Sequence, residues 1–262
     1  MDIRFLIFLC LLCIVFFFWM NQYCKSTIQI EKFKNMIIFL SKNQLYEFLQ
    51  KNEDNYYQRF FDLDLKARKI NSIEDYQPYI QQAVSNGDNI VKEKVLKGIQ
   101  KADAFFKNID LEYFHGRKIN QIPWKIGFVQ NKLYENGLPH TRQDIIILNQ
   151  EKVKHSSLHN LIKTLIHEKI HVYQKIYPGD VEKFIQLKKF KKIKKRDAFD
   201  KIRANPDLDD YIYQDEFHNT YKALYNNHPS SIEDITYYPQ NSQSFEHPNE
   251  KMAIDIEYMY KG

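Results

Sequence analysis

Apolar residues recur every three or four positions along the first part of the chain, the spacing of one face of an α-helix. Between residues 25 and 70 this spacing predicts one or two helices, because no Pro interrupts it. Ser72 and Asp75 are typical of a helix start, and Pro78 limits that helix to beginning near Tyr76. A longer helix is predicted over residues 88–108, where one apolar stripe comprises Val91, Val95, Ile99, Ala102, Phe106 and Ile109.

The apolar pattern then changes and predicts strands. Residues 123–129 (PWKIGFV) and 144–148 (DIIIL) are short, rich in β-branched residues and bounded by turn residues. Between them, Asn136-Gly137 is a turn signal. Ser156 or Ser157 then begins a predicted helix that runs to about Tyr177, where Pro178-Gly179 ends it.

The remaining chain has a mostly helical pattern. Helical spacing resumes after Asp180 and continues into residues 188–196 (KKFKKIKKR), where Phe190 and Ile193 would form the buried side of a solvated basic helix. Residues 221–225 and 232–238 are predicted strands of a hairpin, and Pro248 and Asn249 start a final helix. This order predicts an α+β fold, with a small mixed sheet packed on the helix that follows Ser157 and a mostly helical C-terminal part.

The segment TLIHEKIHVY, residues 164–173, carries the strongest chemical signal in the chain. His167 and His171 are four residues apart, so a helix places both imidazoles on one face, within reach of a single ion. Glu168 lies about 100° around the helix from His167, where it can act on a molecule that the ion binds. This HExxH pattern is that of zinc peptidases, in which the two His bind Zn²⁺ and the Glu is the general base.

A catalytic zinc ion needs a third protein ligand and keeps one position for water. The residues after His171 do not continue as HExxHxxGxxH, which excludes the metzincin class. Glu250, at the start of the last predicted helix and directly after Asn249, is the predicted third ligand. Glu246, His247 and Glu257 remain alternatives, and Glu257 shares a helical face with Glu250.

Three segments resemble the zincin family of metallopeptidases. TLIHEKIHVY resembles the extended zincin motif, in which uncharged residues surround the two His and the Glu. PNEKMAIDIEY, residues 248–258, is similar to the second motif of gluzincins, where a helix-borne Glu is the third ligand and commonly follows Asn. GLPHTRQDIIIL, residues 137–148, is similar to the edge strand along which these enzymes bind the substrate backbone.

With its N-terminal apolar run and its Lys-, Ile- and Asn-rich composition, the chain resembles membrane-anchored metallopeptidases encoded by large DNA viruses of eukaryotes. The resemblance covers residues 124–258 and implies a zincin-like fold with zinc endopeptidase activity. It implies that His167, His171 and Glu250 bind Zn²⁺, while Glu168 takes a proton from the attacking water. We expect three regions: an anchor at 1–24, a helical region at 25–110 and a catalytic region at 111–262.

Two positions depart from the family pattern. Lys169 is charged where the zincin motif is uncharged, so its stem must run to solvent or its ammonium must meet a carboxylate. Ile254 occupies the place of the Asp that commonly orients the first His in gluzincins, and Asp255 is one residue further on. The groups that orient the imidazoles therefore cannot be transferred from the family to this chain.

Peptide hydrolysis also needs a cationic or hydroxyl group that stabilises the oxyanion or binds substrate. The sequence does not rank the candidates, which are His140, Arg142, Arg203, Tyr213, His218 and Tyr237.

The first apolar run, residues 5–20 (FLIFLCLLCIVFFFWM), predicts a single transmembrane helix. Its 16 residues, extended by Ile3 and a snorkelling Arg4, approach the roughly 20 that span a bilayer. A secretory signal is the alternative, but bulky aromatic residues at 16–19 stand where a cleavage site needs small residues. We therefore expect an uncleaved anchor.

Charge and cysteine usage predict which side of the membrane the globular part occupies. Lysines follow the apolar run at positions 25, 32 and 34, which favours a cytosolic body. All three cysteines lie at or before position 24, so the rest of the chain contains no disulfide, and the chain has no Asn-x-Ser/Thr glycosylation site. A reducing, cytosolic location fits both observations, including the cytosolic side of a virion or viral-factory membrane.

The net charge of +5 is too small to indicate a nucleic-acid-binding protein, but the basic residues cluster at 188–196. This run is expected to be a solvated helix face or a contact with an anionic surface. Two functions other than catalysis remain open: a structural membrane or virion protein that keeps a zincin fold, and a module that binds anionic lipid or nucleic acid. In that last case, neutralising Lys191, Lys192, Lys194 and Lys195 would flatten the salt dependence of binding without affecting zinc.

Overall fold

A computed structural model describes residues 16, 19–20, 36–240 and 245–262 of the chain. Residues 39–262 form one compact unit. The predicted anchor at residues 5–20 lies largely outside the described residues. Among the residues that are described, no helix has the length and apolar character needed to cross a membrane.

The N-terminal part of the compact unit is less helical than the spacing predicts. A short strand β1 (Ile37–Phe39) precedes α2 (Lys42–Lys51), whose N-cap Ser41 forms a capping box with Gln44. A 3₁₀ turn η1 (Tyr57–Arg59), α3 (Asp62–Ala67) and α4 (Tyr76–Ala83) follow, and β2 (Val84–Ser85) ends this part. The helix start near Tyr76 is confirmed, whereas the continuous helices predicted up to residue 70 are broken.

The long helix predicted over residues 88–108 is confirmed as α5 (Asn89–Phe106), with Asp88 as its N-cap. Its predicted stripe is buried from Val91 to Phe106. Gly98 lies in this stripe, and a Cβ there would stand 2.6 Å from Cδ1 of Leu165, which belongs to α8 (Leu158–Ile176). The missing side chain therefore lets α5 pack closely against the helix that carries the His pair.

A mixed sheet lies beside that helix. The strand order is β1-β5-β7-β6, with β5 at Trp124–Val129, β6 at His140–Arg142 and β7 at Ile145–Asn149, while β2 also pairs with β5. β5 and β7 are parallel, as Ile126↔Ile146 shows, and β6 pairs antiparallel with β7, as Thr141↔Ile146 shows. The two predicted strands are confirmed, and β6 is an edge strand of this sheet.

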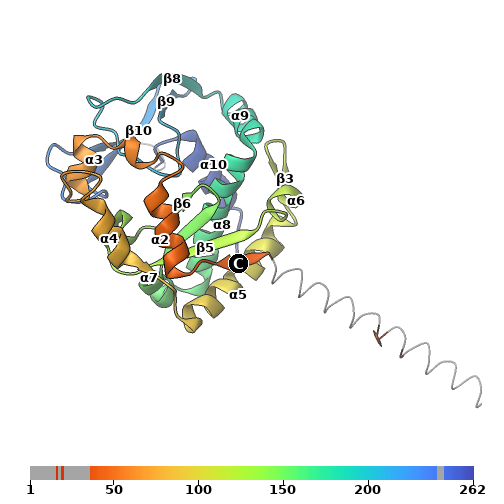
Figure 1. The fold of residues 1–262 in the computed structure, drawn as a ribbon. Coiled ribbons are helices and arrows are strands. Elements are labelled where there is room, and N and C mark those ends of the chain that lie inside the picture. The colour runs from red at the N-terminus through yellow and green to blue at the C-terminus, as the bar shows by residue number, and fades with distance from the viewer. Residues whose placement is uncertain (1–15, 17–18, 21–35, 241–244) are drawn as a thin grey trace, which may run out of the picture. The chain divides into compact units, whose positions relative to one another are not determined.

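The helix predicted from Ser157 is confirmed as α8 (Leu158–Ile176), with Ser157 as its N-cap. It follows α7 (Gln150–His155) and is followed by α9 (Pro178–Leu187), which has Pro at its first position. A short ribbon β3 (Asp110–Leu111) with β4 (Phe114–His115) and the turn α6 (Gly116–Ile119) lie earlier in the chain. Figure 1 shows α8 among the other elements of the unit, with α5 and α7 at one end and β8 and β9 at the other.

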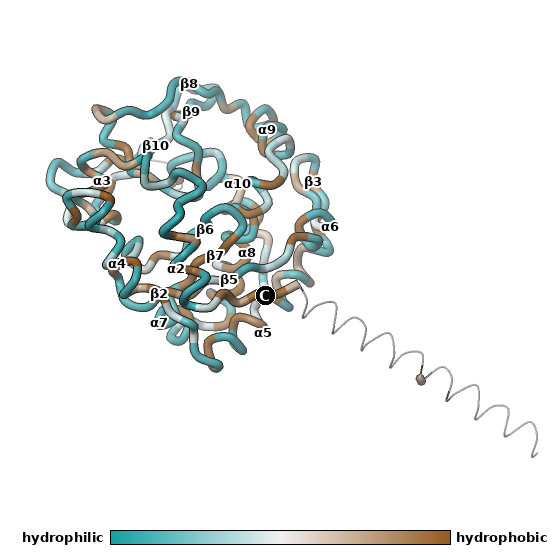
Figure 2. The backbone as a smooth tube through the Cα atoms, in the orientation of Figure 1, coloured by the Kyte–Doolittle hydropathy of each residue, from teal (hydrophilic) through white to brown (hydrophobic). Residues whose placement is uncertain are grey.

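The basic run is a strand, so the helix predicted there is wrong. β8 (Lys191–Lys195) is the edge of a second sheet, in the order β11-β10-β9-β8, and all five of its residues are exposed, including Ile193. An edge strand that alternates lysines on both faces needs no buried side. In Figure 2 this strand lies at the rim of the unit. Its charge is partly offset, since Lys194 pairs with Asp197 and Asp200, and Lys192 with Asp209.

The rest of the second sheet is antiparallel. β9 (Tyr211–Gln214) pairs with β8 and β10 (Thr220–Tyr225), and β10 forms the predicted hairpin with β11 (Ile235–Tyr238). Because four strands follow α9, the expectation of a mostly helical C-terminal part is wrong. The last helix is confirmed as α10 (Pro248–Glu257), with His247 as its N-cap.

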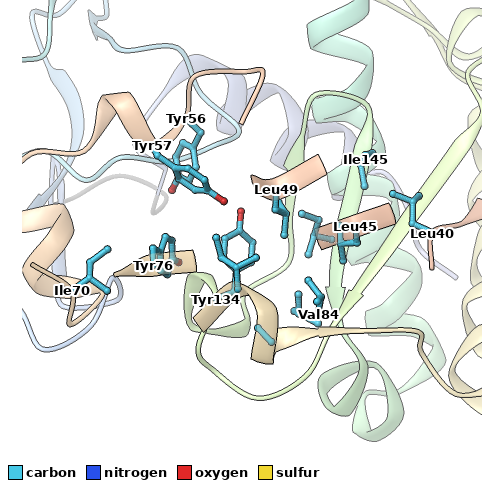
Figure 3. Close-up of a cluster of buried hydrophobic side chains, with 14 of the residues drawn as sticks. Leu40, Leu45, Leu49, Tyr56, Tyr57, Ile70, Tyr76, Val84, Tyr134 and Ile145 are labelled. Carbon is cyan, nitrogen blue, oxygen red and sulfur yellow. The ribbon is translucent and has the colours of Figure 1, made fainter. Parts of the chain in front are cut away.

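The N-terminal helices pack into the same compact unit as the segment that carries the His pair. A core cluster joins residues from α2 and α4 to residues from the sheet, and Figure 3 shows its tyrosines on one side of Leu45 and Leu49. Among its members, Tyr76 belongs to α4 and Ile145 to β7. The α+β class is confirmed, and this cluster joins the N-terminal helices to the first sheet.

Candidate metal centre

The two imidazoles of α8 face each other at one position. The ring centroids of His167 and His171 are 4.8 Å apart, and their Nε2 atoms are 3.1 Å apart. Two nitrogens bound to one tetrahedral zinc ion, each at about 2.0–2.1 Å, lie about 3.3 Å from each other. The helix therefore presents the two imidazoles at the separation that one ion requires.

The other nitrogen of each imidazole is held by an acceptor. His171 Nδ1 lies 2.9 Å from Gln174 Oε1, and Gln174 Nε2 donates to the carbonyl oxygen of Asn249 at 2.9 Å. That second bond fixes the amide orientation, so His171 Nδ1 must be the donor to Gln174. His167 Nδ1 lies 3.1 Å from Glu257 Oε2, a carboxylate oxygen that accepts a hydrogen bond in the same way. Both Nε2 atoms are thus left as lone-pair donors toward the space between them.

Glu250 completes this group from the first turn of α10. Its Oε2 is 3.3 Å from His167 Nε2 and its Oε1 is 3.5 Å from His171 Nε2. Within the described part of the chain, His167, His171 and Glu250 are the group of three potential ligand side chains whose atoms converge, all within 4.8 Å of one another. The donor set of two imidazoles and one carboxylate, with the spacing of a single ion, fits a zinc ion.

The three alternative ligands have other partners. Glu246 forms an ion pair with Arg203 and accepts from Asn205 Nδ2 at 2.9 Å. His247 caps α10 by accepting from the Asn249 N–H, and its Nε2 lies 2.9 Å from Asp209 Oδ1. Glu257 holds His167 Nδ1, on the side away from His171, and also pairs with Lys163. None of these three residues belongs to the group of converging ligand atoms.

The electrostatics of the group follow from burying acceptors together. Burial lowers the pKa of His167, but hydrogen bonds with Glu250 and Glu257 hold it well above its ordinary value. Burial raises the pKa of Glu250, but the two imidazoles hold it well below its ordinary value. A positive charge between these residues is therefore strongly favoured.

Glu168 is buried beside the group and faces a different part of the site. Its Oε2 accepts from the Thr141 hydroxyl at 3.0 Å, and Thr141 belongs to the edge strand β6. Burial raises the pKa of Glu168 to about 8, and the negative charge of Asp207 acts in the same direction. A carboxylate with a raised pKa retains a proton that it accepts, which suits a general base that later acts as an acid.

Lys169 meets neither expectation for its side chain, which is 1% exposed. Its ammonium donates to the carbonyl oxygens of Ile122 and Pro123, both at 2.8 Å, and lies 4.5 Å from the centroid of the Trp124 ring. Burial lowers the pKa of Lys169 to about 7. The charged residue in the motif thus points away from the His pair and ties α8 to the start of β5.

A cavity of about 210 Å³ opens beside His167, Glu168 and Glu250. Three of the six oxyanion and substrate-binding candidates line it: His140, Arg203 and Tyr237. His140 Nδ1 lies 2.9 Å from the carbonyl oxygen of Leu138, and burial lowers the pKa of His140. A second, shallower hollow of about 360 Å³ shares Pro139, His167 and Glu168 with this cavity.

The other three candidates lie away from this cavity lining. Arg142 is fully buried, pairs with Asp54 and stacks over the rings of Tyr56 and Tyr57. Tyr213 donates to Asp209 at 2.9 Å and contacts His247. His218 lies in the turn between β9 and β10 with a positive φ of 65°. Arg142 and Tyr213 are therefore buried outside the cavity, and His218 is exposed in its turn.

Sequence reasoning missed three residues that the fold brings to the site, Gln174, Thr141 and Asp207, and it considered Glu257 only as an alternative ligand. Gln174 and Glu257 hold the imidazoles, Thr141 holds Glu168, and Asp207 lies beside Glu168. Gln174, three residues after His171 on one helix, and Glu257, two helical turns after Glu250, have spacings that could have revealed them. Thr141 and Asp207 lie in separate segments, and no local pattern marks them.

Comparisons of the chain with protein families, with curated proteins and with solved structures found no match.

Proposed function

We propose that this protein is a zinc-dependent peptidase with a zincin-like site. The observation that carries the proposal is the convergence of three acceptors, His167 Nε2, His171 Nε2 and the Glu250 carboxylate, with Glu168 next to them. His171 is buried, and His167 and Glu250 are half-buried. Acceptors that face one another in such a site repel unless a cation lies between them. A bound divalent ion satisfies all three at once.

Each residue then has a defined task. His167, His171 and Glu250 would hold the ion, while Gln174 and Glu257 keep both Nδ1 atoms protonated. Zinc, when bound, lowers the pKa of a water ligand and polarises a carbonyl group. Glu168 accepts the proton of the attacking water and passes it to the leaving amine nitrogen as the C–N bond breaks. Arg203 and Tyr237 line the cavity with groups that can donate to a substrate oxygen.

The apolar run at residues 5–20 supports a peptidase that is attached to a membrane. The scissile bond would lie between the two hollows, which meet at Pro139, His167 and Glu168. A substrate would therefore contact both sides of His167 and Glu168, which we call the catalytic pair, as a peptide does when it continues beyond the bond that is cut.

The test is metal analysis of the purified full-length protein and of two variants. We expect one zinc ion per chain in the wild type. Glu168→Gln should keep the zinc and lose hydrolysis of unstructured peptides, because it removes the base and leaves the ligands. Glu250→Ala should bind zinc more weakly, because one ligand is lost.

A folded wild-type protein that binds no zinc would sink the whole proposal. If Glu250→Ala binds zinc as tightly as the wild type, only the assignment of the third ligand fails. A matched control is Glu182→Gln on α9, which changes an exposed carboxylate outside the site and should leave zinc content unaltered.

A further inference from the structure

The edge strand beside the site has its outward backbone groups already bonded. β6 pairs with β7 through His140, Thr141 and Arg142, and alternate residues of an antiparallel strand turn their backbone groups away from the partner. Thr141 is the residue of β6 whose backbone N–H and C=O groups point away from β7. Its N–H donates to Asp207 Oδ1 at 2.7 Å, and its carbonyl oxygen accepts from Lys175 Nζ at 2.6 Å.

Asp207 and Lys175 form one cover over this edge. Their charged groups are 3.9 Å apart, and Lys175 also donates to the carbonyl oxygen of Pro206 at 3.2 Å. Lys175 comes from α8, four residues after His171, so the helix that carries the His pair supplies half of the cover. Asp207 comes from residues 204–208, which lie in the connection between β8 and β9 of the second sheet.

The segment at 204–208 is anchored from behind by the N-terminal part of the unit. Arg59 donates to the carbonyl oxygen of Asn205 at 2.8 Å, and Asp64 accepts from the Ala204 N–H at 2.8 Å. On its other side, Asn205 Nδ2 lies 3.4 Å from Glu250 Oε1. The segment is therefore held between the core and the candidate metal centre, where it forms one wall of the cavity.

An extended polypeptide that binds at a sheet edge gains its affinity from the outward N–H and C=O groups of that edge. On β6 both groups of Thr141 are bonded within the chain, and the segment at 204–208 fills the adjoining space. A substrate main chain would have to displace two charge-assisted hydrogen bonds before it could pair there. Additional substrate residues that extend along β6 would therefore add little binding affinity.

We infer that Asp207 and Lys175 determine substrate length: they close β6 to main-chain pairing, so the site selects short peptides over extended polypeptides. The inference rests on the proposed peptidase function and narrows it. A short peptide reaches the catalytic pair through the two hollows, and it needs no backbone bond to Thr141. The endopeptidase activity expected from the family resemblance would then be restricted to peptides of limited length.

The test compares two peptides that contain the same scissile bond, one of about three residues and one of about ten, which is as long as a long strand. For the wild-type, zinc-loaded, full-length protein, we expect kcat/KM for the long peptide to be no higher than for the short one. The double variant Asp207→Ala/Lys175→Met uncovers Thr141. It should raise the ratio of kcat/KM for the long peptide to kcat/KM for the short peptide at least about tenfold. This factor corresponds to the free energy of one charge-assisted hydrogen bond.

The ratio is the informative quantity, because Asp207 also acts on Glu168 and changes both rates together. Asp207→Asn is the matched control: it keeps an acceptor oxygen for the Thr141 N–H and should retain the wild-type ratio. Amide hydrogen exchange at Thr141 gives a second readout. The N–H should be protected in the wild type and in Asp207→Asn, and should exchange faster in the double variant.

A wild-type protein that prefers the long peptide by tenfold or more overturns the inference, as does a double variant whose ratio is unchanged. Failure of the proposed function looks different: neither peptide is hydrolysed in a zinc-dependent manner. In that case binding of the labelled long peptide, measured by fluorescence anisotropy, still decides the inference. Binding should be at least about tenfold tighter to the double variant than to the wild type, and equal binding would overturn it.

Discussion

Two buried polar clusters lie in the same unit and are built on opposite principles. In the first, which we call the closed cluster, Arg68 donates to both carboxylate oxygens of Glu135 at 2.6 and 2.9 Å, and Tyr56 and Tyr76 donate to the same carboxylate. In the second, the candidate metal centre, His167, His171 and Glu250 direct acceptors at one another.

The difference lies in whether the charges balance within the chain. The closed cluster has a permanent cation, Arg68, and every group named has a partner, so it contributes to the framework and needs nothing further. The candidate metal centre lacks a permanent cation between its acceptors. Acceptors that face one another without such a cation repel, which is why we propose that a metal ion binds between them.

The largest effect is expected from Glu168→Gln, which acts on the chemistry alone. Peptide hydrolysis should fall by about 10²–10⁴-fold, the contribution of a general base. Zinc content and thermal stability should match the wild type, because Glu168 is not a ligand. Steady-state kinetics with a fluorogenic peptide measures the loss, and activity within threefold of wild type would contradict the assigned role.

Breaking the closed cluster should instead affect stability. Arg68→Met leaves Glu135 buried without its cation and should lower the free energy of unfolding by about 3–5 kcal/mol. Urea unfolding measures this loss. The double variant Arg68→Met/Glu135→Gln should recover part of it, because the uncompensated charge is gone. If the single variant is as stable as the wild type, the closed cluster does not hold the framework.

A smaller effect is expected at the residues that accept hydrogen bonds from the imidazoles of the candidate metal centre. Glu257→Ala should weaken zinc binding about 10–100-fold, the usual cost of losing such a partner. Glu257→Gln keeps an acceptor oxygen and should lose less. Competition with a chelating indicator measures both affinities, and equal affinities for the alanine variant and the wild type would remove Glu257 from the site.

The smallest effect concerns acid stability in the framework. Burial raises the pKa of Asp54, but its hydrogen bond and ion pair with Arg142 hold that pKa below its ordinary value. A depressed pKa stabilises the fold above the unfolded-state value of about 3.9, and this contribution is lost as the pH falls through the folded-state value. Asp54→Asn should therefore cost about 1 kcal/mol at pH 7 and very little near pH 2.

Urea unfolding of the wild type and Asp54→Asn at both pH values measures this difference. A cost that is the same at pH 7 and pH 2 would show that the ionised form of Asp54 is not what stabilises the fold. Zinc affinity should not change, because Asp54 lies in the framework with Arg142 and not among the converging acceptors.

The elements with a strong period could be predicted from the sequence. α5 and α8 have complete apolar stripes and N-cap residues, and β5 and β7 are short β-branched runs, so local spacing and propensity decided them. The strand β8 was predicted as a helix. KKFKKIKKR satisfies a helical spacing as well as an exposed strand, and the partner strand β9 decided between the two.

The residues of the candidate site also divide into those that local spacing predicts and those that tertiary contacts decide. His167, Glu168 and His171 lie within one helical turn, so their relative geometry is a property of the α-helix and could be predicted. Glu250 was one of several carboxylates that local pattern could not separate. Tertiary packing of α10 on α8 placed it at the two Nε2 atoms and placed Glu257 behind His167.

What the sequence by itself determined is therefore the HExxH turn of α8, the α+β class and the apolar run at residues 5–20. Only the tertiary structure decided which distant groups surround that turn: Gln174 toward Asn249, Thr141 toward Glu168, and Asp207 with Lys175 across β6. The physical reason is the range of the forces. Helical periodicity acts over a few residues, whereas these contacts exist because burial of apolar side chains from separate segments brings those segments within hydrogen-bonding distance.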